Sequence, residues 1–300
     1  MKSILELLKE KILLGDGALG TMLQKHGLSL GECPEYWNIT KADIVTDIHL
    51  EYIDAGADII LTNTFGANKI KLSKFNLEGK IKEINVNAVK NARKVAKDNV
   101  FIAGNLGPTG SLLEPLGDLT SEEVYNVFKE QVLCLIEGGV DLIIIETMIS
   151  IEEVVLATKA AKENSDLPVA SLMTFEVNKN GIKTVMGVDV KTMVEELEKG
   201  GADIIGTNCG SGIKNMIEVV KAIKKETNKF IMAEPNAGLP VLKNGVVVYD
   251  GTPEVMSSYI PHLIDAGTNI IGGCCGTTPQ HIKSMREKII VCPPNAGNYC

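Results

Sequence analysis

Short apolar runs alternate with longer amphipathic segments along most of the chain. The runs are three to six residues long and rich in Ile, Val and Leu, which is typical of parallel strands that are buried on both faces. We predict eight strands, at 12–14, 58–62, 100–104, 141–146, 168–173, 203–207, 229–233 and 269–272.

Between these runs, apolar residues recur three or four positions apart, as they do on one face of a helix. The sequence also carries helix start signals. Thr120 stands before two acids, and Thr252 stands before Pro253 and Glu254, which favours capped helix beginnings at both places. The predicted helices include 81–97, 121–137, 151–162, 190–199, 213–225 and 253–266.

Eight strands that alternate with helices predict an α/β fold, the closed (β/α)8 or TIM barrel. Four phrases that lead into the even-numbered strands resemble one another: DAGADII, EGGVDLI, KGGADII and DAGTNII. In each, a helix is expected to end at glycine before the chain turns into a strand, so the repeat is structural. An open doubly wound sheet is the alternative, but no G-x-G-x-x-G follows the first strand, and eight units favour closure.

We expect one domain over residues 1–290, because no Pro/Ser-rich linker divides the chain. The segment before the first strand should be a helical extension that covers the bottom of the barrel. Residues 291–300, with the sequence VCPPNAGNYC, are interpreted as a tail or as the stump of a linker to a further module.

Composition and charge narrow the possible partners. Hydrophobic residues make up 45% of the chain and charged residues 23%, as in a globular protein with a full core. The net charge is −8 and no Lys/Arg block stands out, which disfavours nucleic acid. Charged residues interrupt the apolar positions near the N-terminus, so neither a signal peptide nor a membrane span is predicted, and we expect a cytoplasmic protein.

Three of the seven cysteines stand where a barrel of this kind builds its active site, at the carboxyl ends of the strands. Cys209 ends the sixth predicted strand, and Cys274 and Cys275 follow the eighth. Three thiolates bind zinc tetrahedrally and leave one position open for a substrate. Core packing and a redox pair stay open as alternatives. The other cysteines are interpreted as buried apolar residues (Cys134, Cys292) or as incidental (Cys33, Cys300).

Two carboxylates follow buried strands. Asp16 comes after the first strand and Glu146 ends the fourth, and neither has an evident partner in the sequence. A buried carboxylate is costly unless it is paired, and a ligand ammonium would provide the pairing. For Asp16, a turn or helix-cap role is the alternative. The glycines near residues 104–110 and 272–276 could also cradle a phosphate, but neighbouring thiolates would repel an anion.

The motifs at the strand ends resemble those of the homocysteine S-methyltransferase family. The resemblance is strongest to the N-terminal homocysteine-binding module of cobalamin-dependent methionine synthases, and it spans nearly the whole chain. The motifs are GDGALGTMLQ (15–24), DIILTNTFGAN (58–68), GNLGPTG (104–110), ETM (146–148), MTF (173–175), GTNCG (206–210), EPNAGLP (234–240) and GGCCGTTPQHI (272–282). Asn105 stands at a position of this pattern where other residues also occur.

The resemblance implies a zinc-dependent methyltransferase that converts homocysteine to methionine. It places zinc on Cys209, Cys274 and Cys275, and the amino acid part of homocysteine on Asp16, Thr62 and Glu146. The implied methyl donor is methylcobalamin on a partner protein or on an absent module, fed by a methyltetrahydrofolate-binding module. Family members that use betaine or S-methylmethionine are the alternative, although the sparse aromatic residues (4%) offer little for an onium cage. A non-catalytic zinc-binding barrel is a further alternative.

Overall fold

In the computed structural model, which describes residues 2–179, 181–243 and 246–291, eight parallel strands form one sheet in the order β1-β12-β9-β8-β5-β4-β3-β2. Gly15 pairs in parallel with Ile59, so the edges at β1 and β2 meet and the sheet closes into the predicted barrel rather than staying open. All eight predicted strands are present. They are β1 (Leu13–Leu14), β2 (Ile59–Leu61), β3 (Phe101–Leu106), β4 (Leu142–Met148), β5 (Val169–Met173), β8 (Ile204–Cys209), β9 (Phe230–Pro235) and β12 (Ile270–Ile271).

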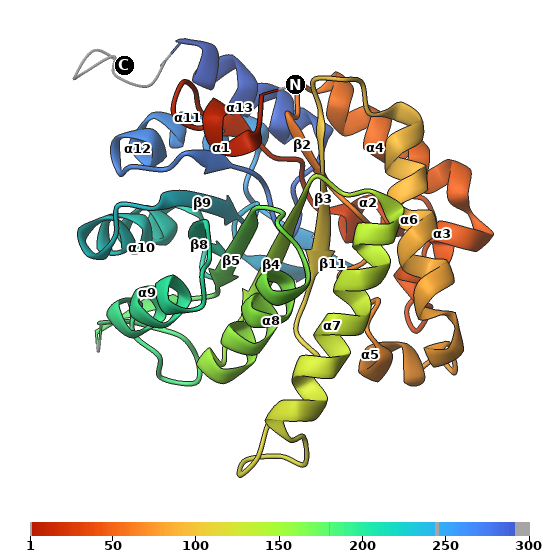
Figure 1. The fold of residues 1–300 in the computed structure, drawn as a ribbon. Coiled ribbons are helices and arrows are strands. Elements are labelled where there is room, and N and C mark those ends of the chain that lie inside the picture. Colours follow the sequence, from red (N-terminus) through yellow and green to blue (C-terminus); the bar gives the residue numbers. More distant parts are fainter. Residues whose placement is uncertain (1, 180, 244–245, 292–300) are drawn as a thin grey trace.

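Helices surround the barrel (Figure 1). Thr120 caps α7 as the sequence predicted, and its hydroxyl accepts a hydrogen bond from the backbone N–H of Glu123. The prediction of one helix over 253–266 was wrong, because Pro261 cannot donate the next helical hydrogen bond and the segment divides at Tyr259. The helices are α1 (Ile4–Leu7), α2 (Leu19–Lys25), α3 (Trp37–Thr40), α4 (Ala42–Asp54), α5 (Lys69–Ser73), α6 (Ile81–Val95), α7 (Ser121–Gly138), α8 (Ile151–Asn164), α9 (Val190–Lys199), α10 (Ile213–Glu226), α11 (Pro253–Ser258), α12 (Ile260–Asp265) and α13 (Pro279–Val291), with short 3-10 turns at Pro34–Tyr36 and Glu78–Lys80.

Successive strand residues belong to two different cores. Leu13 and Ile59 pack inside the barrel, whereas Leu14 and Ile60 pack against the helices, as expected when side chains alternate across a strand. The N-terminal helix α1 contributes buried Ile4 to the inner core. The predicted helical extension therefore closes the amino end of the barrel, opposite the carboxyl ends of the strands.

The repeated phrases before the even-numbered barrel strands have a common structural role. In each, the Asp or Asn side chain accepts a hydrogen bond from a backbone N–H of the preceding barrel strand. The pairs are Asp58 with Leu14 (2.8 Å), Asp141 with Ile102 (2.7 Å), Asp203 with Val169 (2.9 Å) and Asn269 with Ile231 (3.0 Å). The repeat thus ties four strand pairs together at the amino end of the barrel.

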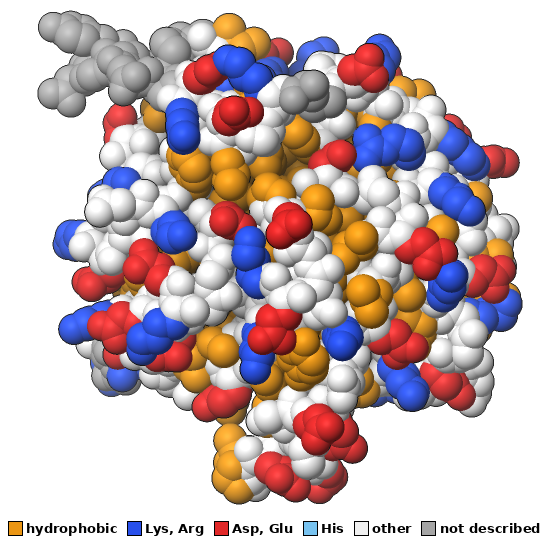
Figure 2. All heavy atoms as spheres, viewed as in Figure 1, with side chains coloured by type: hydrophobic (Ala, Val, Ile, Leu, Met, Phe, Trp, Pro, Cys, Tyr) orange, Lys and Arg blue, Asp and Glu red, His pale blue; other side chains and the backbone are white. Residues whose placement is uncertain are grey.

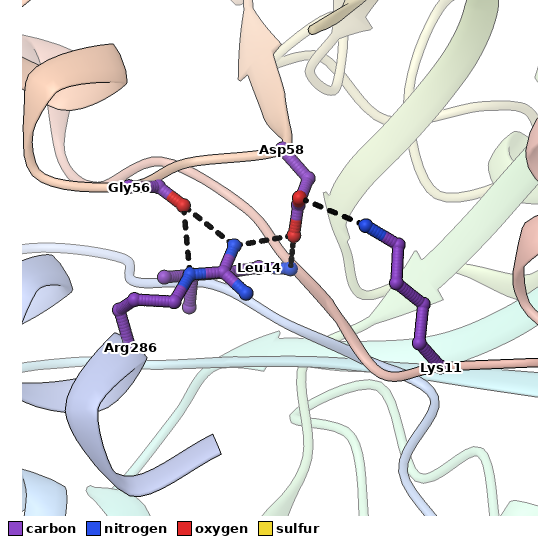
Figure 3. Close-up of polar contacts among 5 residues, drawn as sticks. All are labelled: Lys11, Leu14, Gly56, Asp58 and Arg286. Carbon is purple, nitrogen blue, oxygen red and sulfur yellow. Dashed lines mark hydrogen bonds and ion pairs between the residues drawn. The ribbon is translucent and has the colours of Figure 1, made fainter. Parts of the chain in front are cut away.

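Cations reinforce these carboxylates. Figure 3 shows Asp58 between Arg286 and Lys11, with Arg286 also donating to the carbonyl oxygen of Gly56. Asp141 pairs with Arg93 and Asp203 pairs with Lys162, both at 3.0 Å. Each of these aspartates therefore combines a backbone hydrogen bond with an ion pair.

Two antiparallel hairpins that were not predicted from the sequence extend the loops after β5 and β9. They are β6 (Glu176–Asn178) with β7 (Gly181–Lys183), and β10 (Pro240–Lys243) with β11 (Val246–Tyr249). In each case the sequence has an Asn-Gly pair where the first strand gives way to the second, which is a strong hairpin signal.

Of the predicted tail 291–300, residues 292–300 lie outside the described residues. Among the helices of the described residues, none combines the length and the apolar composition needed to cross a membrane.

Candidate metal and substrate site

The sulfur atoms of Cys209, Cys274 and Cys275 lie within 4.8 Å of one another at the carboxyl end of the barrel. Cys209 ends β8 in the left-handed backbone region, with φ of 61°. After β12 the chain makes a tight turn, in which the N–H of Thr277 donates to the carbonyl oxygen of Cys274 (3.1 Å). The turn lets two adjacent cysteines face the same point, which an extended strand would not allow.

Two other cysteines among the described residues, Cys33 and Cys134, take no part in this cluster. Cys33 and Cys134 are buried in a separate apolar cluster near α6, which agrees with the interpretation of Cys134 as a small apolar residue. Cys292 and Cys300 lie outside the described residues. The structure therefore separates three candidate ligands from two buried thiols.

Polar neighbours surround the three sulfurs. Asn236 directs its Nδ2 at the sulfur of Cys209 (3.4 Å) and at the carbonyl oxygen of Gly210 (3.0 Å). The Tyr249 hydroxyl, from the β10–β11 hairpin, hydrogen-bonds the thiol of Cys275. Asn236 Oδ1 is buried and has no hydrogen-bond partner among the described residues. An oxygen donor is thus left over beside the three sulfurs.

The protonation of the cysteines shows why a cation suits them. Hydrogen bonds from the Cys274 and Cys275 thiols lower the pKa of Cys209, which favours its thiolate form. The pKa of Cys274 is raised well above its usual range, first by its hydrogen bonds to Cys209 and Cys275 and then by burial. A divalent ion would allow all three to ionise. Three cysteine sulfurs with a further position for a fourth ligand match the donor set of zinc.

Three carboxylates lie at the same end of the barrel: Asp16, Glu146 and Glu234. Asp16 accepts a hydrogen bond from the N–H of Leu61 (2.9 Å), and Glu146 accepts one from Asn208 (2.7 Å). Glu234 lies beside Gly272, where a Cβ atom would come within 2.9 Å of the Glu234 Oε1. None of the three acids forms an ion pair within the described residues.

Burial is the main influence on these acids. It raises the pKa of Glu146 to about 7, and the negative charge of Cys209 adds to the effect. Burial also raises the pKa of Asp16 and of Glu234 well above the usual range, and the charges of Glu146 and Asp16 raise that of Glu234 further. The acids therefore interact electrostatically with one another, and a cationic group bound among them would be strongly stabilised.

Thr62 and Asn105 hold one another in place beside Glu146. The Thr62 hydroxyl accepts a hydrogen bond from the backbone N–H of Asn105 (3.1 Å) and shares another with the hydroxyl of Thr64 (2.6 Å). The Asn105 side chain hydrogen-bonds Glu146, while its buried Oδ1 has no partner in the described part of the chain. Thr62 is therefore largely occupied by internal hydrogen bonds, and Asn105 has a free acceptor.

Asn208 connects the sulfur group to the acids. Its Nδ2 donates to Glu146 and to the Thr147 hydroxyl (2.8 Å), and it lies 3.8 Å from the sulfur of Cys274. Its Oδ1 accepts the backbone N–H of Thr147 (2.7 Å). Because this residue precedes Cys209, a single strand end contributes to both halves of the site.

Four residues that the structure places here were not among the predicted site residues: Asn208, Glu234, Asn236 and Tyr249. Asn208, Glu234 and Asn236 follow the carboxyl ends of predicted strands. They could therefore have been predicted in the same way as the cysteines, from their position at a strand end. Tyr249 reaches the site from an unpredicted hairpin, and only the hairpin signal of an Asn-Gly pair in the sequence could have pointed to it.

Comparisons with known proteins identify the family. The family described as homocysteine S-methyltransferase matches residues 13–289. Methionine synthases of Mycobacterium leprae and Mycobacterium tuberculosis are each 30% identical over 96% and 95% of this chain, which spans 25% of their length. The metallated homocysteine methyltransferase MmuM of Escherichia coli has a similar fold, with a TM-score of 0.78 at 22% identity over 94% of this chain and 98% of that one. As its motifs predicted, the chain belongs to the homocysteine S-methyltransferase family.

Proposed function

We propose that this chain transfers a methyl group to the thiol of homocysteine and so makes methionine, with zinc bound by Cys209, Cys274 and Cys275. The observation that carries the proposal is a single site with two unlike halves: three sulfurs within 4.8 Å of one another, and buried acids that form no ion pair among the described residues. Homocysteine has a thiol for the first half and an ammonium for the second.

At the sulfur half, the protein supplies the ligands and their surroundings. Zinc bound there would hold the substrate sulfur as a thiolate at neutral pH, when a free thiol is mostly protonated. Asn236 and Tyr249 hydrogen-bond Cys209 and Cys275 and thereby orient them. The unpartnered Oδ1 of Asn236 would be available as an oxygen ligand when no substrate thiol is present.

At the acidic half, Asp16, Glu146 and Glu234 would hold the substrate ammonium. The three N–H groups of an ammonium need three acceptors, and the free Oδ1 of Asn105 is available beside the carboxylates. A bound ammonium favours ionised Glu146, whose pKa burial raises to about 7. Thr62 contributes by positioning Asn105 through its backbone N–H.

The reaction then needs little from the protein besides placement. The sulfur lone pair forms a bond to the methyl carbon, and the donor leaves with the electron pair of the bond that breaks. No base is required at the methyl group. Fixing the amino acid end of the substrate at one half leaves its sulfur directed at the other, which is catalysis by orientation.

For the donor we propose a methylcobalamin-bearing protein or module, fed by methyltetrahydrofolate. The chain matches one quarter of the length of two methionine synthases, which leaves room in those proteins for other modules. Direct use of betaine or S-methylmethionine is the second candidate. An onium methyl group favours a cage of aromatic faces, and aromatic residues make up only 4% of the chain, which makes this candidate weaker.

A donor panel tests the proposal. Zinc-loaded protein with homocysteine should form methionine from methylcobalamin, and not from betaine or S-methylmethionine. Calorimetry with homocysteine, before and after removal of the metal, separates an enzyme from a non-catalytic zinc-binding barrel. The enzyme should bind homocysteine much more tightly with zinc present, whereas binding of zinc without any affinity for the thiol would contradict the proposal.

A further inference from the structure

The loop between β3 and α7 projects from the barrel at the end opposite α1 (Figure 1). We call residues 111–119 the rim loop. It follows Asn105 of the site by a few residues, and its base is fixed where Thr109 donates to Glu153 through its backbone N–H (2.7 Å) and its hydroxyl (2.6 Å). The loop therefore stands at the mouth of the barrel on a firm base.

Internal contacts give the rim loop a defined shape. The N–H of Glu114 donates to the carbonyl oxygen of Leu119 (2.9 Å), and that of Gly117 donates to Leu113 (2.9 Å). Leu113 and Leu119 pack against the main hydrophobic core. A side chain at position 117 would place its Cβ 2.2 Å from the carbonyl oxygen of Leu112, so only glycine fits this turn. The projection is thus preorganised, which lowers the entropic cost of binding.

The outer surface of the rim loop is apolar and acidic. Leu116 is 69% exposed and Leu112 is 45% exposed, and Figure 2 shows hydrophobic and acidic side chains gathered on the projecting end. Glu114 and Asp118 form no ion pair with any part of the chain that the structure describes. At the base of the loop, the Nζ atom of Lys74 lies 3.8 Å from the place that a Cβ atom would take at Gly110.

We infer that the rim loop docks the protein or module that delivers the methyl group, through a partner surface that is apolar at its centre and basic around it. This inference rests on the proposed function, in which a macromolecular donor must bring its methyl group to the mouth of the barrel. A preformed apolar tip supplies the contact that excludes water. Unpaired acids on a chain of net charge −8 attract a basic surface and accelerate encounter.

A comparison of two methyl donors separates an effect on docking from an effect on the methyl transfer itself. The first is free methylcobalamin, and the second is the corrinoid-binding module of a cobalamin-dependent methionine synthase loaded with methylcobalamin. Leu116→Glu should lower kcat/KM for the module about tenfold or more, as loss of a central apolar contact does, and should leave the rate with free methylcobalamin unchanged. The matched control is Ile290→Glu on α13, at a position 70% exposed and remote from the mouth, which should change neither rate.

A charge reversal gives an independent readout. The double variant Glu114→Lys with Asp118→Lys should slow transfer from the module at low salt and flatten its dependence on ionic strength. Equal losses with both donors, or a wild-type protein that uses the module no faster than free methylcobalamin, would overturn the docking inference alone. If no methionine forms with free methylcobalamin and none forms with the loaded module, the proposed function itself is contradicted.

Discussion

The two ends of the barrel hold their carboxylates in opposite ways. At the amino end, Asp58, Asp141 and Asp203 each accept a backbone N–H and pair with a cation. At the carboxyl end, Asp16 and Glu146 are buried and have no ion-pair partner within the described residues. The carboxylates at the amino end therefore find their ion-pair partners within the folded chain. Those at the carboxyl end find none among the described residues.

This difference separates stability from function within one fold. A buried carboxylate without a partner is costly, so its persistence is a reason to look for a ligand that supplies the missing charge. Paired carboxylates contribute to folding and need no ligand. Changes at the amino end should therefore affect stability and leave activity unchanged. Changes at the carboxyl end should affect binding and catalysis, and also stability where they remove a buried carboxylate without an ion-pair partner.

The largest effect should follow removal of a sulfur ligand. We predict that Cys209→Ser or Cys275→Ser lowers kcat by about 10³-fold or more, because the several kcal/mol that a bound metal contributes are lost. Zinc content, measured by elemental analysis, should fall with activity. Cys134→Ala, at a buried cysteine outside the cluster, is the control and should keep both; full zinc binding and activity in the Cys209 variant would refute the assignment.

The next effect concerns the acidic half. Glu146→Gln should lower kcat/KM for homocysteine by about 10- to 100-fold, because a charged hydrogen bond to the ammonium becomes a neutral one. Zinc content should stay unchanged. With 4-mercaptobutanoate, which lacks the amino group, variant and wild type should differ little. An equal loss with both thiols would show that Glu146 acts on the sulfur half instead.

The same residue predicts a dependence on pH. Burial raises the pKa of Glu146 to about 7, so between its usual pKa and about 7 the folded protein holds a proton that the unfolded chain has released. The free energy of unfolding of the substrate-free protein should therefore fall as pH rises through this range. Glu146→Gln should remove about 2 kcal/mol of that fall, measured by urea denaturation at pH 5 and pH 8. An identical pH profile in the variant would assign the effect to other groups.

The smallest effect belongs to the amino end. Arg286→Met removes the guanidinium beside Asp58 and should lower the free energy of unfolding by about 1 to 2 kcal/mol, since Lys11 and the N–H of Leu14 remain as partners. The value of kcat/KM should not change. A loss of activity in a variant that stays folded would break the separation between the two ends.

Most of the fold could be predicted from the sequence, because short apolar runs mark buried parallel strands and the glycine phrases mark the turns before them. The cysteines could be predicted as a group since each stands at a strand end. Glu234 and Asn236 also stand at a strand end, but they were not predicted as site residues. Their place in the site follows from their closeness to Gly272 and Cys209 in space, which the sequence does not contain. Tyr249 depends on the path of a hairpin, which no strand-end rule contains.

The central claim is that three cysteines bind one zinc ion and leave a position that the substrate thiol takes. X-ray absorption at the zinc edge, recorded on the same sample before and after homocysteine is added, tests it most directly. We predict three sulfur neighbours at about 2.3 Å in the free protein and four after addition. An unchanged sulfur count with saturating homocysteine would contradict the account.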